Sequence, residues 1–245
     1  MKKIFSGHPH PAARITPPVS RILHLVSCIS LLLLTGCASI PFKTVPPTAP
    51  GTNSFETVRS AFARTQDPSY EALQSVVFQL FGRKMTGLGY FSVDAETSAF
   101  ALSCMTPMGM KLFDIQGQGD AVEAVFALPQ FGQKENLARA VGLDLKRTYF
   151  DNIPSGKAEV RRKKHRLVFV ERQADGRTEY DFGGPEQFLL EKRVYAGRKM
   201  VCRIRYYEYE PQDEFFYPHG IVLENRKYHY QLILRLKSVY PALSK

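Results

Sequence analysis

The residue with the clearest chemistry in this chain is Cys37, which follows a short apolar run from Ile22 to Leu34. Basic residues precede the run, and Leu34-Thr35-Gly36-Cys37 closes it. This order is typical of bacterial lipoprotein signals, in which cleavage before the cysteine leaves a residue acylated on its sulfur and its new amino group. A run of about 13 residues is too short to span a bilayer and fits a signal peptide. We therefore expect residues 1–36 to be removed and Cys37 to carry palmitate-like chains.

This anchor determines where the chain is expected to reside. One acyl chain gives marginal membrane binding, whereas two or more anchor a protein stably. In a bacterium with two membranes, Ala38 in place of Asp after the cysteine favours the outer membrane, with the domain facing the periplasm. The alternatives are an uncleaved membrane helix or a chance occurrence of the motif. Residues 37–53 hold the lipidated cysteine and a Pro-rich, mobile tether, and residues 54–245 form a single domain.

Charge and length set broad limits on function. The chain of 245 residues has a formal net charge of +10. Residues 1–36 contain four basic and no acidic residues, so the mature chain would have 29 basic against 23 acidic residues, or +6. A domain of this size can bury one substantial core. An exported chain with this modest charge is not expected to bind nucleic acid.

The strongest local charge feature is a basic run in the second half of the domain. The run comprises Arg161, Arg162, Lys163, Lys164 and Arg166. Its two interpretations are a solvated hairpin arm and a surface that contacts anionic lipid headgroups.

The histidines that survive processing, His165, His219 and His229, are the first candidates for catalytic chemistry. The sequence has no His-Glu-x-x-His or Cys-x-x-Cys metal motif and no Gly-x-Ser-x-Gly elbow. Asp213 and Glu214 near His219 resemble an acid–base group, but adjacent carboxylates before a turn more often serve loop solvation. We therefore predict no enzymatic activity, no catalytic residues, no cofactor and no metal.

Two further cysteines, Cys104 and Cys202, fall on apolar faces of expected strands. In an oxidising compartment they are a possible disulfide pair. The alternative is that they are two buried thiols.

The elements expected around these residues are mostly strands. Two helices are predicted first, one over residues 55–63 with Ser54 as its cap and one over residues 69–81, and a third over residues 133–149. From Met85 the apolar period is two, which indicates about ten antiparallel strands joined by short turns.

A sheet this large with few helices must curl or leave apolar surface open, so we expect an incomplete barrel around an apolar cavity. A filled sandwich core would show the same alternation. The residues expected to face the cavity are Phe91, Val93, Phe100, Leu102, Leu112, Phe126, Ile204, Tyr206, Leu232 and Leu234.

Several stretches together resemble one known family. They are Gly87-Leu-Gly-Tyr-Phe-Ser-Val-Asp94, Phe100-Ala-Leu-Ser-Cys-Met-Thr-Pro-Met-Gly109, Lys111-Leu-Phe-Asp114, Tyr217-Pro-His-Gly-Ile-Val-Leu223 and Tyr230-Gln-Leu-Ile-Leu-Arg-Leu-Lys237. Together with the lipobox and the Pro-rich tether, they resemble the LolA/LolB-like superfamily, and within it the uncharacterised outer-membrane lipoproteins related to LolB. The resemblance covers roughly residues 69–240.

This resemblance implies a curved antiparallel half-barrel of about 10–11 strands, with two or three helices as a lid over an apolar cavity that binds acyl chains. It also implies a membrane-contact hairpin at Pro107, Met108 and Gly109. Met108 stands where LolB proteins have a protruding Leu, and it is apolar and more flexible. The alternative is an ordinary turn whose Met packs on a neighbour. The cargo expected is lipid or lipoprotein.

Two functions from different classes remain at this point. The first is binding or transfer of an acyl-chain-bearing ligand at the outer membrane. The second is a non-catalytic assembly or structural factor of an envelope complex, whose concave sheet binds another envelope protein.

Overall fold

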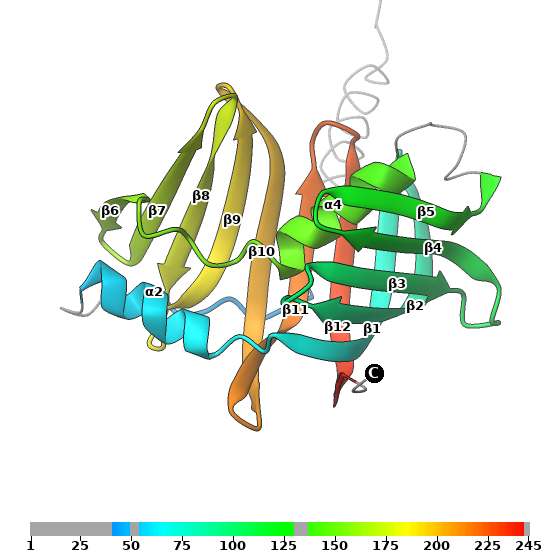
Figure 1. Ribbon diagram of the computed structural model, residues 1–245, viewed down its shortest axis with the longest axis horizontal. Helices are drawn as coiled ribbons and strands as arrows, with labels where there is room; N and C mark the ends of the chain where they lie inside the picture. The colour runs from blue at the N-terminus through cyan, green and yellow to red at the C-terminus, as the bar shows by residue number, and fades with distance from the viewer. Residues whose placement is uncertain (1–40, 50–53, 130–136, 243–245) are drawn as a thin grey trace, which may run out of the picture. The chain divides into compact units, whose positions relative to one another are not determined.

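The computed structural model describes residues 41–49, 54–129 and 137–242, so the signal segment and Cys37 lie outside the described residues. The described elements all belong to one compact unit, Phe42–Lys245. Within it, twelve strands form one antiparallel sheet in the order β5-β4-β3-β2-β1-β12-β11-β10-β9-β8-β7-β6 (Figure 1). The strands are β1 (Ser69–Leu80), β2 (Arg83–Asp94), β3 (Ala99–Met105), β4 (Lys111–Gln118), β5 (Ala121–Ala127), β6 (Glu159–Lys163), β7 (Arg166–Gln173), β8 (Gly176–Gly183), β9 (Phe188–Ala196), β10 (Lys199–Gln212), β11 (Phe215–Asn225) and β12 (Tyr230–Pro241).

The first and last strands of this order, β5 and β6, do not pair, so the sheet is an unclosed, curved half-barrel. Side chains alternate along each strand, so every second residue points to the inner face of the sheet. Examples are Val76 and Phe78 of β1 and Leu232 and Leu234 of β12, which are all buried. The expected fold class is confirmed. The sheet has one or two strands more than the sequence predicted.

The segment of residues 69–81, which was expected to form a helix, is strand β1 in the structure. Tyr70, Leu73, Val77 and Leu80 do have helical spacing, but the buried positions are Ala72, Gln74, Val76 and Phe78, with a period of two. This segment pairs along its length with both β2 and β12. Pairing on both sides satisfies its backbone donors and acceptors, so tertiary context overrides the local helical spacing.

Two helices are described, α2 (Phe55–Arg64) and α4 (Leu137–Tyr149). The Ser54 side chain accepts a hydrogen bond from the Thr57 amide, as its predicted capping role requires. The α4 helix lies against the inner face of the sheet (Figure 1), where Leu137 and Leu145 are buried. The α2 helix inserts Phe62 against Phe182 of β8. Both helices therefore cover the inner face, as a lid would.

The outer face of the sheet carries an ion-pair lattice over β8, β9 and β10. Arg193 contacts Glu179 at 3.2 Å and Asp181 at 2.6 Å, and Arg203 contacts Glu191 at 2.8 Å. These cross-strand pairs match opposite charges on neighbouring strands, which supports the register.

Candidate functional site

The inner face is apolar where the sequence predicted it, and in this structure it is packed. Nine of the ten expected cavity residues are buried, namely Phe91, Val93, Phe100, Leu102, Leu112, Ile204, Tyr206, Leu232 and Leu234. Leu137, Val141 and Leu145 of α4 belong to the same core cluster. The helix thus occupies much of the space that the curved sheet would otherwise enclose.

Phe126 is the exception, because 41% of it is exposed. The alternation predicted that Phe126 shares a face with Ala124. However, a bulge shifts the register between Asp114 and Ile115, so Ala124 pairs with Ile115 and Phe126 with Asp114. The extra residue moves Phe126 to the outer face, and it is not a cavity residue.

A pocket of about 250 Å³ remains beside the C-terminal end of α4, between that helix, the end of α2 and the sheet. Its aromatic lining is Tyr70, Tyr149, Phe150, Tyr206, Tyr209, Phe216 and Tyr217. Four of the five tyrosine hydroxyl groups donate hydrogen bonds to protein partners. Tyr149 donates to Gln74 at 2.8 Å, Tyr209 to the Leu189 carbonyl at 2.9 Å, and Tyr206 to Asn152 at 3.0 Å.

This lining is electrically neutral apart from Asp67, which accepts a hydrogen bond from Tyr217. Burial raises the pKa of Tyr70, Tyr149, Tyr206 and Tyr209 above the ordinary value of 10.0, so these rings stay uncharged. A ligand here would meet aromatic rings, and four of the five tyrosine hydroxyls are already hydrogen-bonded to the protein. The pocket thus offers a ligand mainly aromatic surface.

The α4 helix is fastened to the sheet by a buried polar cluster at its middle. The Asp144 carboxylate is fully buried and accepts hydrogen bonds from the Tyr230 hydroxyl at 2.7 Å and the Asn225 amide at 2.6 Å. Arg147, one turn further along, donates to its other oxygen at 2.7 Å. Because the Tyr230 and Asn225 bonds form only when α4 is docked, they fix the position of the helix, whereas the Arg147 pair lies within the helix itself.

A second fastening holds the C-terminal end of α4. The buried Lys192 ammonium donates to the carbonyls of Arg147, at 2.6 Å, and of Asp151. Burial lowers the pKa of Lys192 to about 8. A cation at a helix C-terminus satisfies carbonyls that have no partner within the helix. The sequence did not identify Lys192 or Asp144 as buried residues, because a charged residue on a strand or helix is normally expected to face solvent.

The hairpin predicted to contact a membrane is a protruding turn between β3 and β4. Gly109 has a φ of +80°, and its amide donates to the Thr106 carbonyl at 2.9 Å. Met108 is 98% exposed and Met110 is 56% exposed. Met108 therefore does not pack on a neighbour, which rules out the alternative of an ordinary turn with a packed methionine. Its contact with a membrane, together with Pro107 and Gly109, stays a prediction.

The disulfide considered from the sequence is absent, because Cys104 and Cys202 are free, buried thiols. They belong to β3 and β10, which β2, β1, β12 and β11 separate in the sheet. Burial raises the pKa of the Cys104 thiol to about 12. The alternative interpretation, two inert buried thiols, is the correct one.

The basic run lies on β6, on the β6–β7 turn and at the start of β7. Arg161 pairs with Glu159 at 2.9 Å, Arg166 pairs with Asp181 at 3.3 Å, and the Arg162 guanidinium lies 5.4 Å from the centre of the Phe55 ring. Lys163 and Lys164 are exposed at the turn. The run is thus an edge hairpin arm, and part of its charge is already paired.

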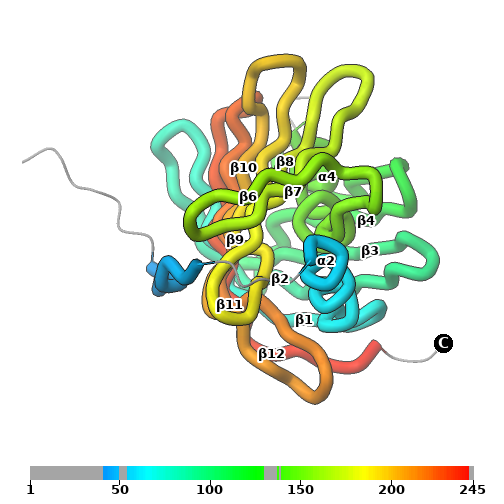
Figure 2. Tube along the Cα trace, turned by 90° about the vertical axis from the view of Figure 1, so that its left-hand side faces the viewer, coloured from blue at the N-terminus to red at the C-terminus, as the bar shows by residue number. Residues whose placement is uncertain are grey.

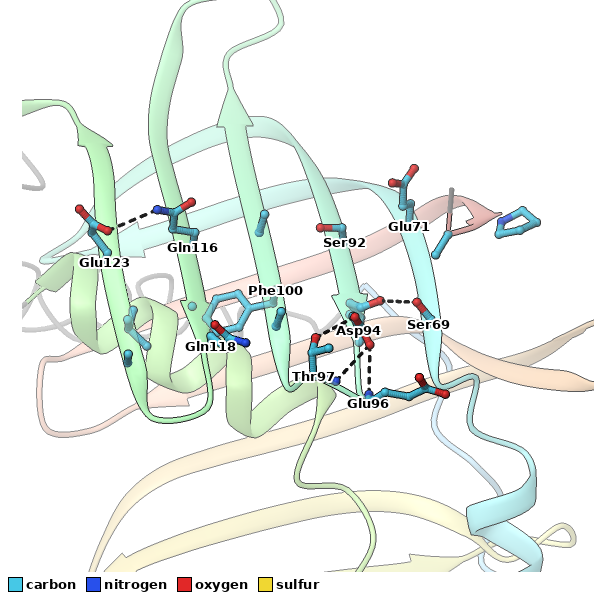
Figure 3. Close-up of a pocket in the computed structure, with 18 residues that line it drawn as sticks. Ser69, Glu71, Ser92, Asp94, Glu96, Thr97, Phe100, Gln116, Gln118 and Glu123 are labelled. Atoms are coloured by element: carbon cyan, nitrogen blue, oxygen red, sulfur yellow. Dashed lines mark hydrogen bonds between the residues drawn. The ribbon is translucent and has the colours of Figure 1, made fainter. Parts of the chain in front are cut away.

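A larger groove, of about 1140 Å³, lies over β1 to β5 and the turns that end them (Figure 3). One row of the sheet crosses it, from Glu71 through Ser92 to Gln116 and Glu123, with Gln116 donating to Glu123 at 3.3 Å. Its lining includes four carboxylates and no Lys or Arg. This composition does not suit an acyl chain.

The histidine that the sequence offered as a candidate for acid–base chemistry has an acidic neighbour. His219 lies 3.4 Å from Glu210, an isolated pair at the surface. Within the described part of the chain, no group of three or more His, Cys, Asp or Glu side chains is arranged to hold a metal ion. In that part, too, none of the helices has the length and apolar character needed to cross a membrane.

Comparison with known proteins gives a match in structure alone, since neither a family model nor a curated protein matches the sequence. A LolA superfamily protein of Nitrosomonas europaea superimposes with a TM-score of 0.53 and 8% identity, covering 79% of this chain and 96% of that one. Two others have lower TM-scores: an outer-membrane lipoprotein-sorting protein domain of Vibrio parahaemolyticus (0.45, 10% identity, covering 78% and 92%) and a DUF1329 family protein of Desulfovibrio piger (0.44, 8% identity, covering 79% and 95%). The first match, together with the unclosed sheet and its covering helices, leads to one conclusion: the chain has the fold of the LolA/LolB-like superfamily.

Proposed function

We propose that this protein is a lipid-anchored, non-catalytic protein that binds or transfers an acyl-chain-bearing ligand, a lipid or a lipoprotein, at the periplasmic side of the outer membrane. The observation that carries the proposal is the aromatic-lined pocket beside α4, whose lining residues Val93 and Tyr206 belong to the apolar cluster of the inner face. The fold supports it, because that fold occurs in a LolA superfamily protein. The lipobox at Cys37 supports the anchor.

The volume of the pocket indicates how a ligand would enter. About 250 Å³ is just below the roughly 300–1,000 Å³ of typical ligand pockets, so it accepts only the end of an acyl chain while α4 is docked. Further entry requires α4 to move away from the inner face. Each methylene that then enters contributes about 0.8 kcal/mol, which offsets the loss of helix contacts. The helix acts as a lid that the ligand displaces.

Two exposed features would contact the bilayer in this account. Cys37 supplies the anchor, and the Met108 tip adds a short apolar insertion. An apolar side chain with almost complete exposure is costly in water and favourable at a membrane surface.

The experiment is binding of a fluorescent fatty acid to residues 38–245, which retain the whole compact unit. Ala63 lines the pocket, so Ala63→Phe should fill it and weaken binding at least about tenfold. Ala61→Phe is the matched control, because Ala61 is an exposed residue of the same helix that does not line the pocket. Equal binding by both variants and the parent chain would contradict the site. Absence of any fatty acid binding would favour the alternative, an envelope factor that binds a protein partner.

A further inference from the structure

Three hairpin turns enclose a basic groove at one end of the sheet. The β1–β2, β9–β10 and β11–β12 turns meet there, as the register Leu80↔Tyr230, Cys202↔Asn225 and Lys199↔Ala196 requires. Figure 2 shows all three turns at the top of the sheet. The groove has a volume of about 890 Å³.

The lining of this groove is cationic and lacks acidic residues. Four of its twelve residues are Arg83, Lys84, Lys199 and Arg226, and no Asp or Glu is among the twelve. All four are exposed. Among the described residues no ion pair involves Arg83, Lys84 or Lys199, and Arg226 reaches Glu224 only at 4.0 Å. The arginines of the outer-face lattice are paired at shorter distances, so this charge is not part of that lattice.

An apolar residue stands at the rim of the same groove. Phe81, in the β1–β2 turn, is 60% exposed and has a φ of 48°, which few bulky residues adopt. An aromatic tip among basic side chains is the composition of surfaces that bind anionic bilayers, where cations meet phosphate groups and rings enter the headgroup layer.

The turns at the opposite end of the sheet differ in charge. The acidic groove of Figure 3 includes the β2–β3 and β4–β5 turns, with Asp94 and Glu96 in its lining. The β6–β7 turn lies at the same end by register and exposes Lys163 and Lys164. A negatively charged surface repels the first feature and attracts the second, so the β6–β7 turn is the contact that must be distinguished from the basic groove.

The described chain before α2 is held on the outer face of the sheet. Phe42 is only 7% exposed and stacks on Tyr207 with ring centres 5.4 Å apart. A Cβ on Gly220 would lie 2.3 Å from the Phe42 ring, so only glycine leaves room for this seat. Phe42 thus covers the middle of β11 and leaves the turns at its ends uncovered.

We infer that the basic groove formed by the three turns binds the phosphate groups of an anionic bilayer and orients the domain on it. The charge of the groove and the exposed Phe81 carry this inference, and only the presence of a bilayer beside the domain rests on the proposed function. By register, the β3–β4 turn with Met108 lies at the same end of the strands as the β1–β2 turn. The twist of the sheet nevertheless points the β3–β4 turn to the side in Figure 1.

The test is co-sedimentation of residues 38–245 with two kinds of vesicle, pure phosphatidylcholine and phosphatidylcholine mixed with phosphatidylglycerol. Arg83→Gln with Lys84→Gln should lower binding to the mixed vesicles about 30-fold at low salt, from about fivefold for each cation. Lys163→Gln with Lys164→Gln is the matched control, because it removes the same charge from the β6–β7 turn at the other end of β7. That control should bind as the parent does, and pure phosphatidylcholine should bind none of them.

Four outcomes would overturn the inference. Equal losses in both double variants would indicate net charge alone, and loss only in the Lys163/Lys164 variant would place the contact on the edge hairpin. Full competition by soluble glycerol phosphate would indicate a small-molecule site. No binding to mixed vesicles by the parent would leave an acidic protein as the partner. Thermal unfolding of every variant checks that the fold is intact. Ala63→Phe alters only the acyl-chain pocket, so it should still bind the mixed vesicles. Retained vesicle binding by Ala63→Phe would show that the basic groove and the acyl-chain site can fail independently.

Discussion

Replacing Asp144 with Asn tests whether α4 is a lid that polar contacts hold shut. The carboxylate is fully buried, and one of its oxygens accepts both the Tyr230 and the Asn225 hydrogen bonds, at 2.7 and 2.6 Å. Asparagine keeps the shape of the side chain and one acceptor oxygen but removes the charge. The change therefore weakens the fastening of α4 without opening a cavity in the core.

The cost can be worked from these contacts. A hydrogen bond to a charged group contributes about 1.5–3 kcal/mol and a neutral one about 0.5–1.5, so each of the two bonds loses about 1 kcal/mol. Arg147 loses its partner as well, but both residues lie on α4, so this ion pair forms in the docked and the open helix and does not change the docking free energy. The free energy of docking α4 should therefore fall by about 2 kcal/mol. The population with α4 open should then rise on the order of 30-fold.

Hydrogen exchange of the α4 amides measures this opening, and stopped-flow uptake of a fluorescent fatty acid measures entry. Asp120→Asn is the control, because Asp120 pairs with Lys146 of the same helix through a side chain that is 97% exposed. It should change both rates little. Faster exchange with unchanged uptake would show that α4 does not gate entry. Unchanged exchange would refute the assignment of Asp144 as the fastening residue.

Three further expectations concern single features of the fold. Phe42→Ala should lower the free energy of unfolding by about 3 kcal/mol, because its ring is seated on the outer face; an unchanged urea midpoint would mean that the seat is not occupied in solution. Lys192 has a folded pKa of about 8 and an unfolded value of 10.5, so the unfolded state binds more protons and stability rises between those pH values. Urea unfolding from pH 7 to 10 should show that Lys192→Met removes up to about 3 kcal/mol of this rise. Cys104 and Cys202 should resist alkylation until the chain unfolds, and a reductant should leave the melting temperature unchanged.

The parts of this structure that follow from the sequence are those fixed by local chemistry. Ser54 caps α2 because its side chain reaches an amide three residues away, and alternation from β2 onward is visible because one face of each strand is buried. The half-barrel follows from having many strands and few helices. Nine of the ten inner-face residues follow from the same alternation.

The parts that do not follow are fixed by partners distant in the chain. β1 has Ala72 and Gln74 at inner positions, so its period of two is weak until β2 and β12 flank it. Phe126 is displaced by one bulged residue, and no pattern within β5 marks that bulge. Asp144 is buried because Tyr230 and Asn225, more than eighty residues away, supply its hydrogen bonds.

The most direct test of the central claim is native mass spectrometry of residues 38–245 purified without detergent, before and after organic extraction. The account predicts bound masses in the lipid range that extraction removes and added lipid restores, with Ala63→Phe carrying less. A clean protein mass that takes up neither phospholipid nor fatty acid would contradict acyl-chain binding.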